Sequence, residues 1–193
     1  MAKQYITAEK LAHGYGDAPL FSGLSFRLPA GHILQLMGKN GSGKTTLLHL
    51  LAGLKHPREG SISRDEETSL LYIGHQNALK LDLSPLENLL LYQPVANVCK
   101  KSLEALGLKP ALHHQPCYTL SAGQQRKVAL SRLMISDARV WIVDEPFTAL
   151  DDSARARIIF CLEEHARQGG CAIVATHDSL DIAEPLLKRM SLS

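Results

Sequence analysis

The chain contains Gly38-Lys-Asn-Gly-Ser-Gly-Lys-Thr45, a stretch that fits the pattern G-x-x-x-x-G-K-[ST]. Glycines in such a loop let backbone N–H groups turn inward to phosphate oxygens without a clash from Cβ atoms. The helix that begins near Lys44 adds the positive end of its dipole, the Lys44 ammonium can reach the β- and γ-phosphates, and the Thr45 hydroxyl can bind Mg²⁺. We therefore expect the loop to hold a phosphate chain through Gly38, Asn40, Gly41, Ser42, Gly43, Lys44, Thr45 and Thr46.

This loop joins a predicted strand to a predicted helix. The apolar run Ile33–Met37 precedes it, and leucines recur at helical spacing over residues 45–54 behind it. Two further apolar runs, at 140–143 and Cys171–Ala175, end in polar residues, as buried parallel strands do. Residues 153–168, between those runs, show helical spacing. The sequence thus predicts an α/β fold, a P-loop NTPase with a mainly parallel central sheet.

The middle of the chain has a different pattern. Residues 76–133 show helical spacing and no run typical of a strand, so we expect a helical insertion. Ser84-Pro-Leu-Glu87 is a capping box with proline at the first helical position, which predicts a helix over 85–92. A second helix is expected over 100–106. Residues 55–68 are charged and contain proline and glycine, so we interpret them as a solvated connection.

Composition restricts the possible classes of protein. Of 193 residues, 45% are hydrophobic and 21% charged, which is typical of a folded globular chain of little more than one domain. Lys and Arg exceed Asp and Glu by 21 − 19 = 2, so no nucleic-acid partner is expected. No window approaches the length of a membrane span, so none is expected. Four cysteines without a C-x-x-C pair predict reduced thiols in a cytosolic setting.

Two carboxylates follow one of the predicted buried strands. Asp144 and Glu145 come directly after the run at 140–143, and ligands bind at the carboxyl ends of strands in open α/β sheets. Alone, such a pair is more typical of a solvated loop, but the phosphate loop in the same chain favours a functional interpretation. We expect Asp144 to hold Mg²⁺ and Glu145 to orient or deprotonate the water that attacks a γ-phosphate.

A second helix start suited to an anion follows the helical insertion. Leu120-Ser-Ala-Gly-Gln124 stands immediately before a helical pattern, with Ser121 as the expected N-cap. By itself this is only a capping signal. Together with the phosphate loop it suggests a nucleotide that is held from two sides. At this point the sequence resembles the ATP-binding subunits of ABC transporters, and the resemblance covers essentially the whole chain.

The resemblance implies roles for three residues outside the phosphate loop. Tyr15 corresponds to the aromatic residue that stacks on adenine, with an ordinary core or surface tyrosine as the alternative. Gln76 corresponds to the glutamine that senses the γ-phosphate and Mg²⁺ and leads into the helical subdomain. His177 corresponds to the histidine that contacts the γ-phosphate. The implied catalytic set is therefore Glu145, His177, Gln76 and Lys44, and the implied Mg²⁺ ligands are Thr45, Gln76 and Asp144.

The same resemblance identifies residues 120–124 as the LSGGQ signature. Ala122 replaces the first of its glycines, a change that we expect to be tolerated because Gly123 remains. Thr148-Ala-Leu-Asp151 resembles the loop through which two subunits communicate. The additional ATP-binding residues implied are Ser121, Ala122, Gly123, Gln124 and Asp151.

The family also implies an architecture and partners. Residues 1–193 would form a single ATP-binding domain with N-terminal antiparallel strands and a helical signature subdomain at about 77–133. Two copies would form a head-to-tail dimer with ATP and Mg²⁺ between the phosphate loop of one protomer and the signature of the other. Integral membrane subunits would be the further partners.

Five stretches are similar to one subfamily, the ATP-binding subunit of bacterial cytochrome c maturation. They lie at residues 20–25, 72–76, 86–89, 121–126 and 144–149. This resemblance implies ATP hydrolysis at the cytoplasmic face of the inner membrane, coupled to haem export or to release of a haem-loaded periplasmic chaperone. It does not decide whether haem itself is transported.

Three other functions are weighed against this one. An ATPase of a lipid, peptide or drug exporter would share the nucleotide site and differ only in its partners. A soluble ABC-type ATPase would need a long coiled coil or two cassettes, for which the chain is too short. A small-molecule P-loop kinase would not need the signature, Asp151 or His177.

Several histidines and a cysteine could suggest a metal or haem contact. His113 and His114 are adjacent, so their side chains project in different directions, and with Cys117 they lack a second ligand pair at a metal spacing. We interpret them as loop residues. For His75 two interpretations stay open, a structural histidine and a subfamily residue near a partner interface.

Overall fold

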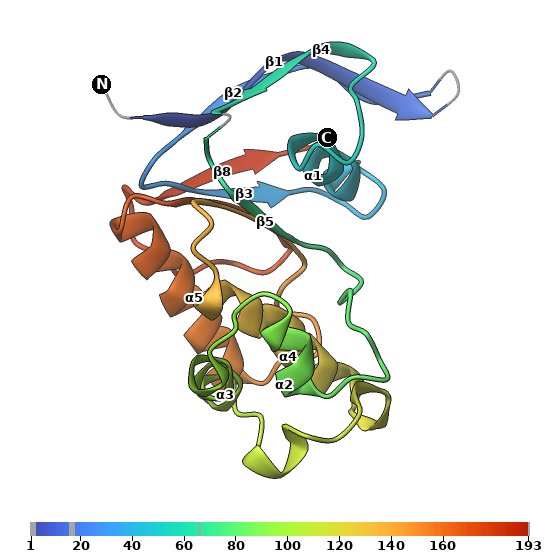
Figure 1. Ribbon diagram of the computed structural model, residues 1–193. Helices are drawn as coiled ribbons and strands as arrows, with labels where there is room; N and C mark the ends of the chain where they lie inside the picture. The colour runs from blue at the N-terminus through green and yellow to red at the C-terminus, as the bar shows by residue number, and fades with distance from the viewer. Residues whose placement is uncertain (1–2, 16–17, 66, 193) are drawn as a thin grey trace.

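A parallel sheet forms the centre of the molecule (Figure 1). Its strand order is β5-β6-β7-β3-β8. The strands are β5 (Leu70–Ile73), β6 (Val140–Asp144), β7 (Cys171–Ala175), β3 (Ile33–Met37) and β8 (Leu187–Ser191). The runs predicted as β3, β6 and β7 are therefore confirmed, with Asp144 as the last residue of β6. The coordinates come from a computed structural model, which describes residues 3–15, 18–65 and 67–192.

A second, antiparallel sheet has the order β2-β1-β4. It contains β1 (Gln4–Tyr15), β2 (Ala18–Pro29) and β4 (Glu59–Arg64). The interpretation of residues 55–68 as a solvated connection was wrong, because β4 pairs with β1 from Ile6↔Arg64 to Ala12↔Glu59. As an edge strand, β4 exposes every side chain except the half-buried Ile62, so its sequence lacks the apolar alternation that marks a strand.

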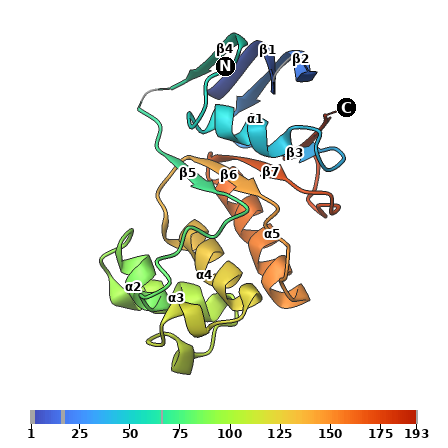
Figure 2. The ribbon, with the colours of Figure 1, turned by 90° about the vertical axis from the view of Figure 1, so that its right-hand side faces the viewer.

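Helices cover both faces of the parallel sheet (Figure 2). Helix α1 (Lys44–Leu51) lies between the two sheets, where its leucines share a core with Leu34 and Leu36 of β3. Helices α4 (Ala122–Ile135) and α5 (Asp152–Arg167) cover the opposite face, in a core that includes Ile33. Alternate residues of β3 thus face the two cores, and this double burial explains its continuous apolar sequence.

The segment between β5 and β6 forms a helical layer. All of residues 76–133 are described, and they contain helices but no strand, as the sequence predicts. Helix α2 (Pro85–Leu90) begins with the expected capping box. Helix α3 (Ala96–Ala105) begins four residues before the predicted start at 100. The sequence does not mark this boundary, because the N-cap residue Val95 has no side-chain capping hydrogen bond. This layer has a core of its own, made of Leu86, Leu89, Cys99, Leu103, Leu108, Cys117, Leu120 and Val128.

The register of the parallel strands brings their carboxyl ends to one edge. Ala175 of β7 lies opposite both Leu36 of β3 and Asp144 of β6, and Val143 lies opposite Ile73 of β5. The four loops that leave these strands therefore start side by side. They contain the phosphate loop, Gln76, Glu145 and His177.

Two simpler expectations can also be compared with the structure. All four cysteines are free thiols, as expected from their spacing. Within the described ranges, no helix has the length and apolar character that a membrane crossing requires.

Candidate functional site

The phosphate loop lies between β3 and α1 and lines a pocket of about 390 Å³. Gly43 is the N-cap of α1 and has a φ of 94°, a left-handed conformation that favours glycine. The loop can therefore turn directly into the helix and present its first N–H groups to the pocket. The residues that line the pocket are Tyr15, Leu20, Asn40, Gly41, Gly43, Lys44, Thr45, Thr46, His75, Asp144 and Glu145.

Lys44 lies folded over the loop that precedes it. Its side chain is buried, and Nζ donates hydrogen bonds to the carbonyl oxygens of Gly38 at 2.8 Å and Lys39 at 3.3 Å. Ser42 Oγ is buried without a hydrogen-bond partner among the described residues. The ammonium is thus held at the centre of the loop by neutral carbonyls, which leaves its positive charge available to an anion.

Thr45 and Asp144 both line the pocket and are hydrogen-bonded to each other. Thr45 Oγ1 donates a hydrogen bond of 2.8 Å to Asp144 Oδ2, which connects α1 with the end of β6. Asp144 is only 1% exposed, and its Oδ1 has no hydrogen-bond partner in the described part of the chain. A hydroxyl and an unpartnered carboxylate oxygen are ligands that Mg²⁺ prefers. The oxygens of Thr45 and Asp144 therefore fit a magnesium ion.

Glu145 turns away from the strand at once. Its φ of 44° is left-handed, which is unusual for a residue with a side chain, and its N–H donates to the carbonyl of Ala175 at 2.8 Å. The carboxylate Oε2 lies 3.2 Å from Nδ1 of His177, whose side chain is 72% exposed. The structure therefore brings together the two residues that the sequence predicted from separate strands.

Arg126 is a residue of this site whose role the sequence reasoning missed. It comes from α4, is 4% exposed, and has a pKa that burial lowers to about 10. Nη1 donates to the carbonyl of Gly74 at 2.8 Å and to Asn77 Oδ1 at 3.1 Å. Nη2 donates to the carbonyls of Asp144 at 2.7 Å and Glu145 at 3.0 Å. One guanidinium thus connects the segment around Gln76, the acidic pair and the helix that follows the signature.

A signal for Arg126 does exist in the sequence. It stands four residues before the buried Leu130, so it occupies the apolar side of α4 rather than its exposed side. A charged residue at such a position predicts a buried partner, although the sequence does not identify the partner.

Gln76 lies beside this pocket rather than in it. It lines an adjoining cavity of about 580 Å³ that shares Thr45 and His75 with the first pocket. Tyr72 also lines this cavity, and burial, together with the charge of Asp144, raises its pKa to about 12. The phenol therefore stays neutral near the acidic pair. His75 lines both the phosphate pocket and this adjoining cavity.

The signature residues form the start of α4. Ser121 Oγ accepts from the N–H of Gln124 at 3.3 Å, and Gln124 Oε1 accepts from the N–H of Ser121 at 2.9 Å. A Cβ atom on Gly123 would lie 2.6 Å from the carbonyl oxygen of Ala149, so only glycine fits this contact. The described residues that line the phosphate pocket do not include Ser121, Ala122, Gly123 or Gln124.

Asp151 belongs to the same region as the signature. It caps α5 by accepting from the N–H of Ala154 at 2.8 Å, and it forms an ion pair with Lys127 of α4. The hydrogen bond from Lys127 is the main reason why the pKa of Asp151 is lowered well below its ordinary value. The structure thus joins the signature to the loop around Asp151 and not to the phosphate loop of the same chain.

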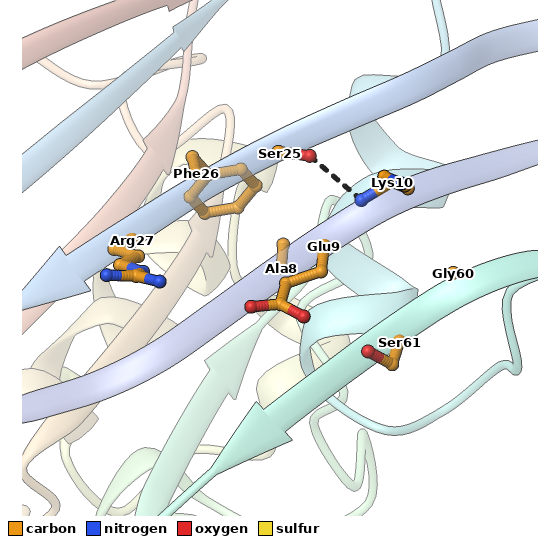
Figure 3. A pocket seen from close by; sticks show the side chains of 8 residues that line it. All are labelled: Ala8, Glu9, Lys10, Ser25, Phe26, Arg27, Gly60 and Ser61. Atoms are coloured by element: carbon orange, nitrogen blue, oxygen red, sulfur yellow. Dashed lines mark hydrogen bonds between the residues drawn. The ribbon is translucent and has the colours of Figure 1, made fainter.

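A third hollow, of about 610 Å³, lies on the antiparallel sheet (Figure 3). It is lined by Ala8, Glu9, Lys10, Ser25, Phe26, Arg27, Gly60 and Ser61, which come from all three strands. These side chains include both signs of charge, and none of the predicted site residues is among them. We therefore place the candidate site at the phosphate loop.

His113, which was interpreted as a loop residue, has a structural contact. His113 is buried, and its Nε2 makes a 3.1 Å hydrogen bond with the carbonyl of Leu108. Among the described residues there is no group of three or more His, Cys, Asp and Glu side chains that could hold a metal ion.

A family pattern and a curated protein are similar to this chain in sequence. The pattern of the family described as "ABC transporter" matches residues 21–148. The cytochrome c biogenesis ATP-binding export protein CcmA of Escherichia coli (strain K12) is 42% identical, over 97% of this chain and 96% of that protein.

Solved structures support the fold. The dimeric bacterial ABC transporter cassette MJ0796 superposes with a TM-score of 0.81 at 22% identity, over 96% of this chain and 94% of that one. The same cassette in a post-hydrolysis state, bound to ADP and Pi, gives a TM-score of 0.77 at 22% identity, over 90% and 88% of the two chains. These likenesses show the α/β fold that the sequence predicts.

Proposed function

The chain belongs to the ABC transporter family, and on that premise we propose that it is the ATP-hydrolysing subunit of a bacterial inner-membrane complex for cytochrome c biogenesis. The observation that carries the ATPase proposal is the shared pocket of the phosphate loop and the acidic pair, joined by the 2.8 Å hydrogen bond between Thr45 and Asp144. The 42% identity to a cytochrome c biogenesis protein supports the biological assignment.

ATP would bind with its phosphates on the loop. The N–H groups at the start of α1 and the Lys44 ammonium would hold the β- and γ-phosphates, and the Tyr15 ring would stack on adenine. Thr45 and Asp144 would hold Mg²⁺, with Gln76 as a further ligand from the adjoining cavity. When bound, Mg²⁺ would offset the negative charge of the phosphates.

Glu145 would act on the attacking water. Its carboxylate orients the water and accepts the proton as the oxygen of that water bonds to the γ-phosphorus and the bond to the ADP oxygen breaks. His177, whose Nδ1 lies 3.2 Å from Oε2, would hold this carboxylate in place and contact the γ-phosphate. The backbone of Glu145 is left-handed, and its carboxylate lies beside His177, which follows β7.

A second copy of the chain would complete the site. Ser121, Ala122, Gly123, Gln124 and Asp151 do not line the pocket of their own chain, whereas their exposed helix N-terminus suits a phosphate. We place them on the ATP of the partner protomer in a head-to-tail dimer. Each protomer would then contribute half of two sites, and ATP binding would close the dimer.

Membrane subunits would dock on the helical layer. We treat residues 1–193 as one cassette with a helical subdomain at about 77–133. Four of the large apolar side chains that this layer exposes lie close together in sequence, namely Leu91, Tyr92, Val95 and Val98. Such a cluster favours contact with another protein. The subunit would thus be peripheral, at the cytoplasmic face of the inner membrane, and would couple hydrolysis to haem export or chaperone release.

Gene deletion tests the biological assignment. We expect loss of covalent haem staining in periplasmic c-type cytochromes, with rescue by the wild-type gene and no rescue by Glu145→Gln. Normal cytochromes in a strain without a redundant system would refute the assignment to cytochrome c biogenesis. Rescue by Glu145→Gln would instead refute the need for hydrolysis.

A further inference from the structure

Tyr15 is exposed, yet its hydroxyl is held. The residue ends β1 beside the phosphate pocket and is 58% exposed. Its hydroxyl accepts a hydrogen bond of 2.8 Å from Nζ of Lys55 and lies 3.4 Å from Oγ1 of Thr46. The ring of His13 meets the Tyr15 ring edge-on, with centroids 5.8 Å apart. An exposed tyrosine is thus restrained at its hydroxyl and at its ring.

Lys55 reaches Tyr15 from the far end of α1. It follows the helix, where its N–H bonds to the carbonyl of His49 at 3.3 Å, and it is half-buried. An ammonium can only donate, so the Tyr15 oxygen is the acceptor of the bond from Lys55. The hydrogen bond from Lys55 also lowers the pKa of Tyr15, in agreement with this polarity.

A cation near a nucleotide can contact the phosphates or act at the base, and the position of Lys55 distinguishes these two roles. Among the described residues, Lys44 and the first turn of α1 line the phosphate pocket, whereas Lys55 does not. Its Nζ is placed on the Tyr15 hydroxyl and 5.2 Å from the centre of the ring. Lys55 is therefore placed to act on the base end of a nucleotide.

We propose that Lys55 is a positioning residue for the nucleotide base, which holds the Tyr15 ring ready for stacking and makes no contact with the phosphates. This inference rests on the proposed function, in which Tyr15 stacks on adenine. Because Lys55 and Thr46 both contact the hydroxyl, the stacked ring would offer its face to the base. A face without a hydrogen-bond donor does not distinguish adenine from guanine.

The test compares ligands with and without a base. Lys55→Met keeps the aliphatic stem and removes the donor, so we expect the dissociation constants of non-hydrolysable ATP and GTP analogues to rise by about three- to tenfold, the equivalent of one hydrogen bond. Both analogues should weaken by the same factor, and inorganic tripolyphosphate should bind as tightly as it does to the wild type. Calorimetry measures all three. Lys101→Met, on the exposed face of α3, is the charge-matched control and should change none of them.

A double-mutant cycle isolates the hydroxyl. In a Tyr15→Phe background, Lys55→Met should cause no further loss of analogue affinity, because the bond is already absent. Lys55→Arg should restore most of the affinity. Thermal melts verify that each variant is folded.

Three results would overturn the inference. A fall in tripolyphosphate affinity in Lys55→Met would place Lys55 on the phosphates. Unchanged affinity for the ATP analogue would show that Lys55 positions nothing, and an undiminished effect in Tyr15→Phe would show that it acts elsewhere. If the wild-type protein bound neither ATP analogue nor tripolyphosphate, the proposed function itself would fall, so the two failures are distinguishable.

Discussion

Replacing Arg126 by methionine tests whether its hydrogen bonds to the backbone at Glu145 support catalysis in addition to the stability of the fold. The change removes four hydrogen bonds, from Nη1 to Gly74 and Asn77 and from Nη2 to Asp144 and Glu145. Each buried carbonyl left without a donor costs about 1–3 kcal/mol, offset in part because a buried charge is also removed. We expect a loss of roughly 2–4 kcal/mol, which a domain of ordinary stability of about 5–15 kcal/mol survives.

The catalytic effect follows from the backbone of Glu145. Its left-handed φ of 44° is held by the bond to Ala175 and by the guanidinium of Arg126. When the guanidinium is lost, the carboxylate should shift, and a displacement of about 1 Å in a catalytic group lowers turnover by about a hundredfold. We expect the kcat for ATP to fall by about ten- to a hundredfold, with a smaller change in KM.

Arg132 provides a matched control on the same helix. It is also 4% exposed, and it donates to the carbonyls of Asn77 at 2.8 Å and Ala129 at 2.9 Å. No described contact joins its side chain to Asp144 or Glu145. Arg132→Met should therefore lower the melting temperature to a similar extent while kcat stays within about threefold of wild type. Equal losses of kcat in the two variants, or a normal kcat in Arg126→Met, would refute the reasoning.

Three further outcomes are expected from single residues. Glu145→Gln should leave ATP binding intact and lower turnover by at least about a hundredfold in a steady-state ATPase assay, and near-normal turnover would remove Glu145 from its role. Gly123→Ala should lower the melting temperature by a few degrees, because its Cβ would lie 2.6 Å from the carbonyl oxygen of Ala149, and an unchanged melting temperature would argue against that contact. The pKa of His165, stacked on Trp141 at 3.7 Å, is lowered by burial, so the unfolded chain binds the proton first and stability should fall as pH decreases below the ordinary histidine value of about 6.5. Urea melts at several pH values check this, and a His165→Gln variant with an undiminished pH dependence would contradict it.

Local patterns were enough to predict the centre of the fold. The apolar run of β3, the glycine loop and the leucines of α1 are neighbours in sequence, so their order predicted strand, loop and helix together. The edge strand β4 was missed because its side chains face solvent and its place depends on pairing with β1, which is far away in the chain. The start of α3 was missed because no side-chain cap marks it.

For the candidate site, the sequence predicts residues at the ends of strands and helices but not the contacts between distant elements. Thr45 begins the helix after the phosphate loop, Asp144 ends β6 and His177 follows β7, and the strand register brings the ends of these strands to one edge. The contacts of Arg126 and Lys55 cross 52 and 40 residues of sequence, to Gly74 and Tyr15 respectively. No periodicity describes such a pairing, because it depends on how separate elements pack rather than on either element alone.

The close packing of Gly123 on Ala149 has a consequence for how two copies would meet. Together with the ion pair between Lys127 and Asp151, it joins the signature and the neighbouring loop into one surface in the single chain. Two separately mobile loops would each lose conformational entropy on association, whereas a surface ordered beforehand loses mainly rigid-body freedom. In the proposed dimer, much of the entropic cost of building the second half of each site is thus already met when the monomer folds, and the free energy of ATP binding remains available for closing the two copies.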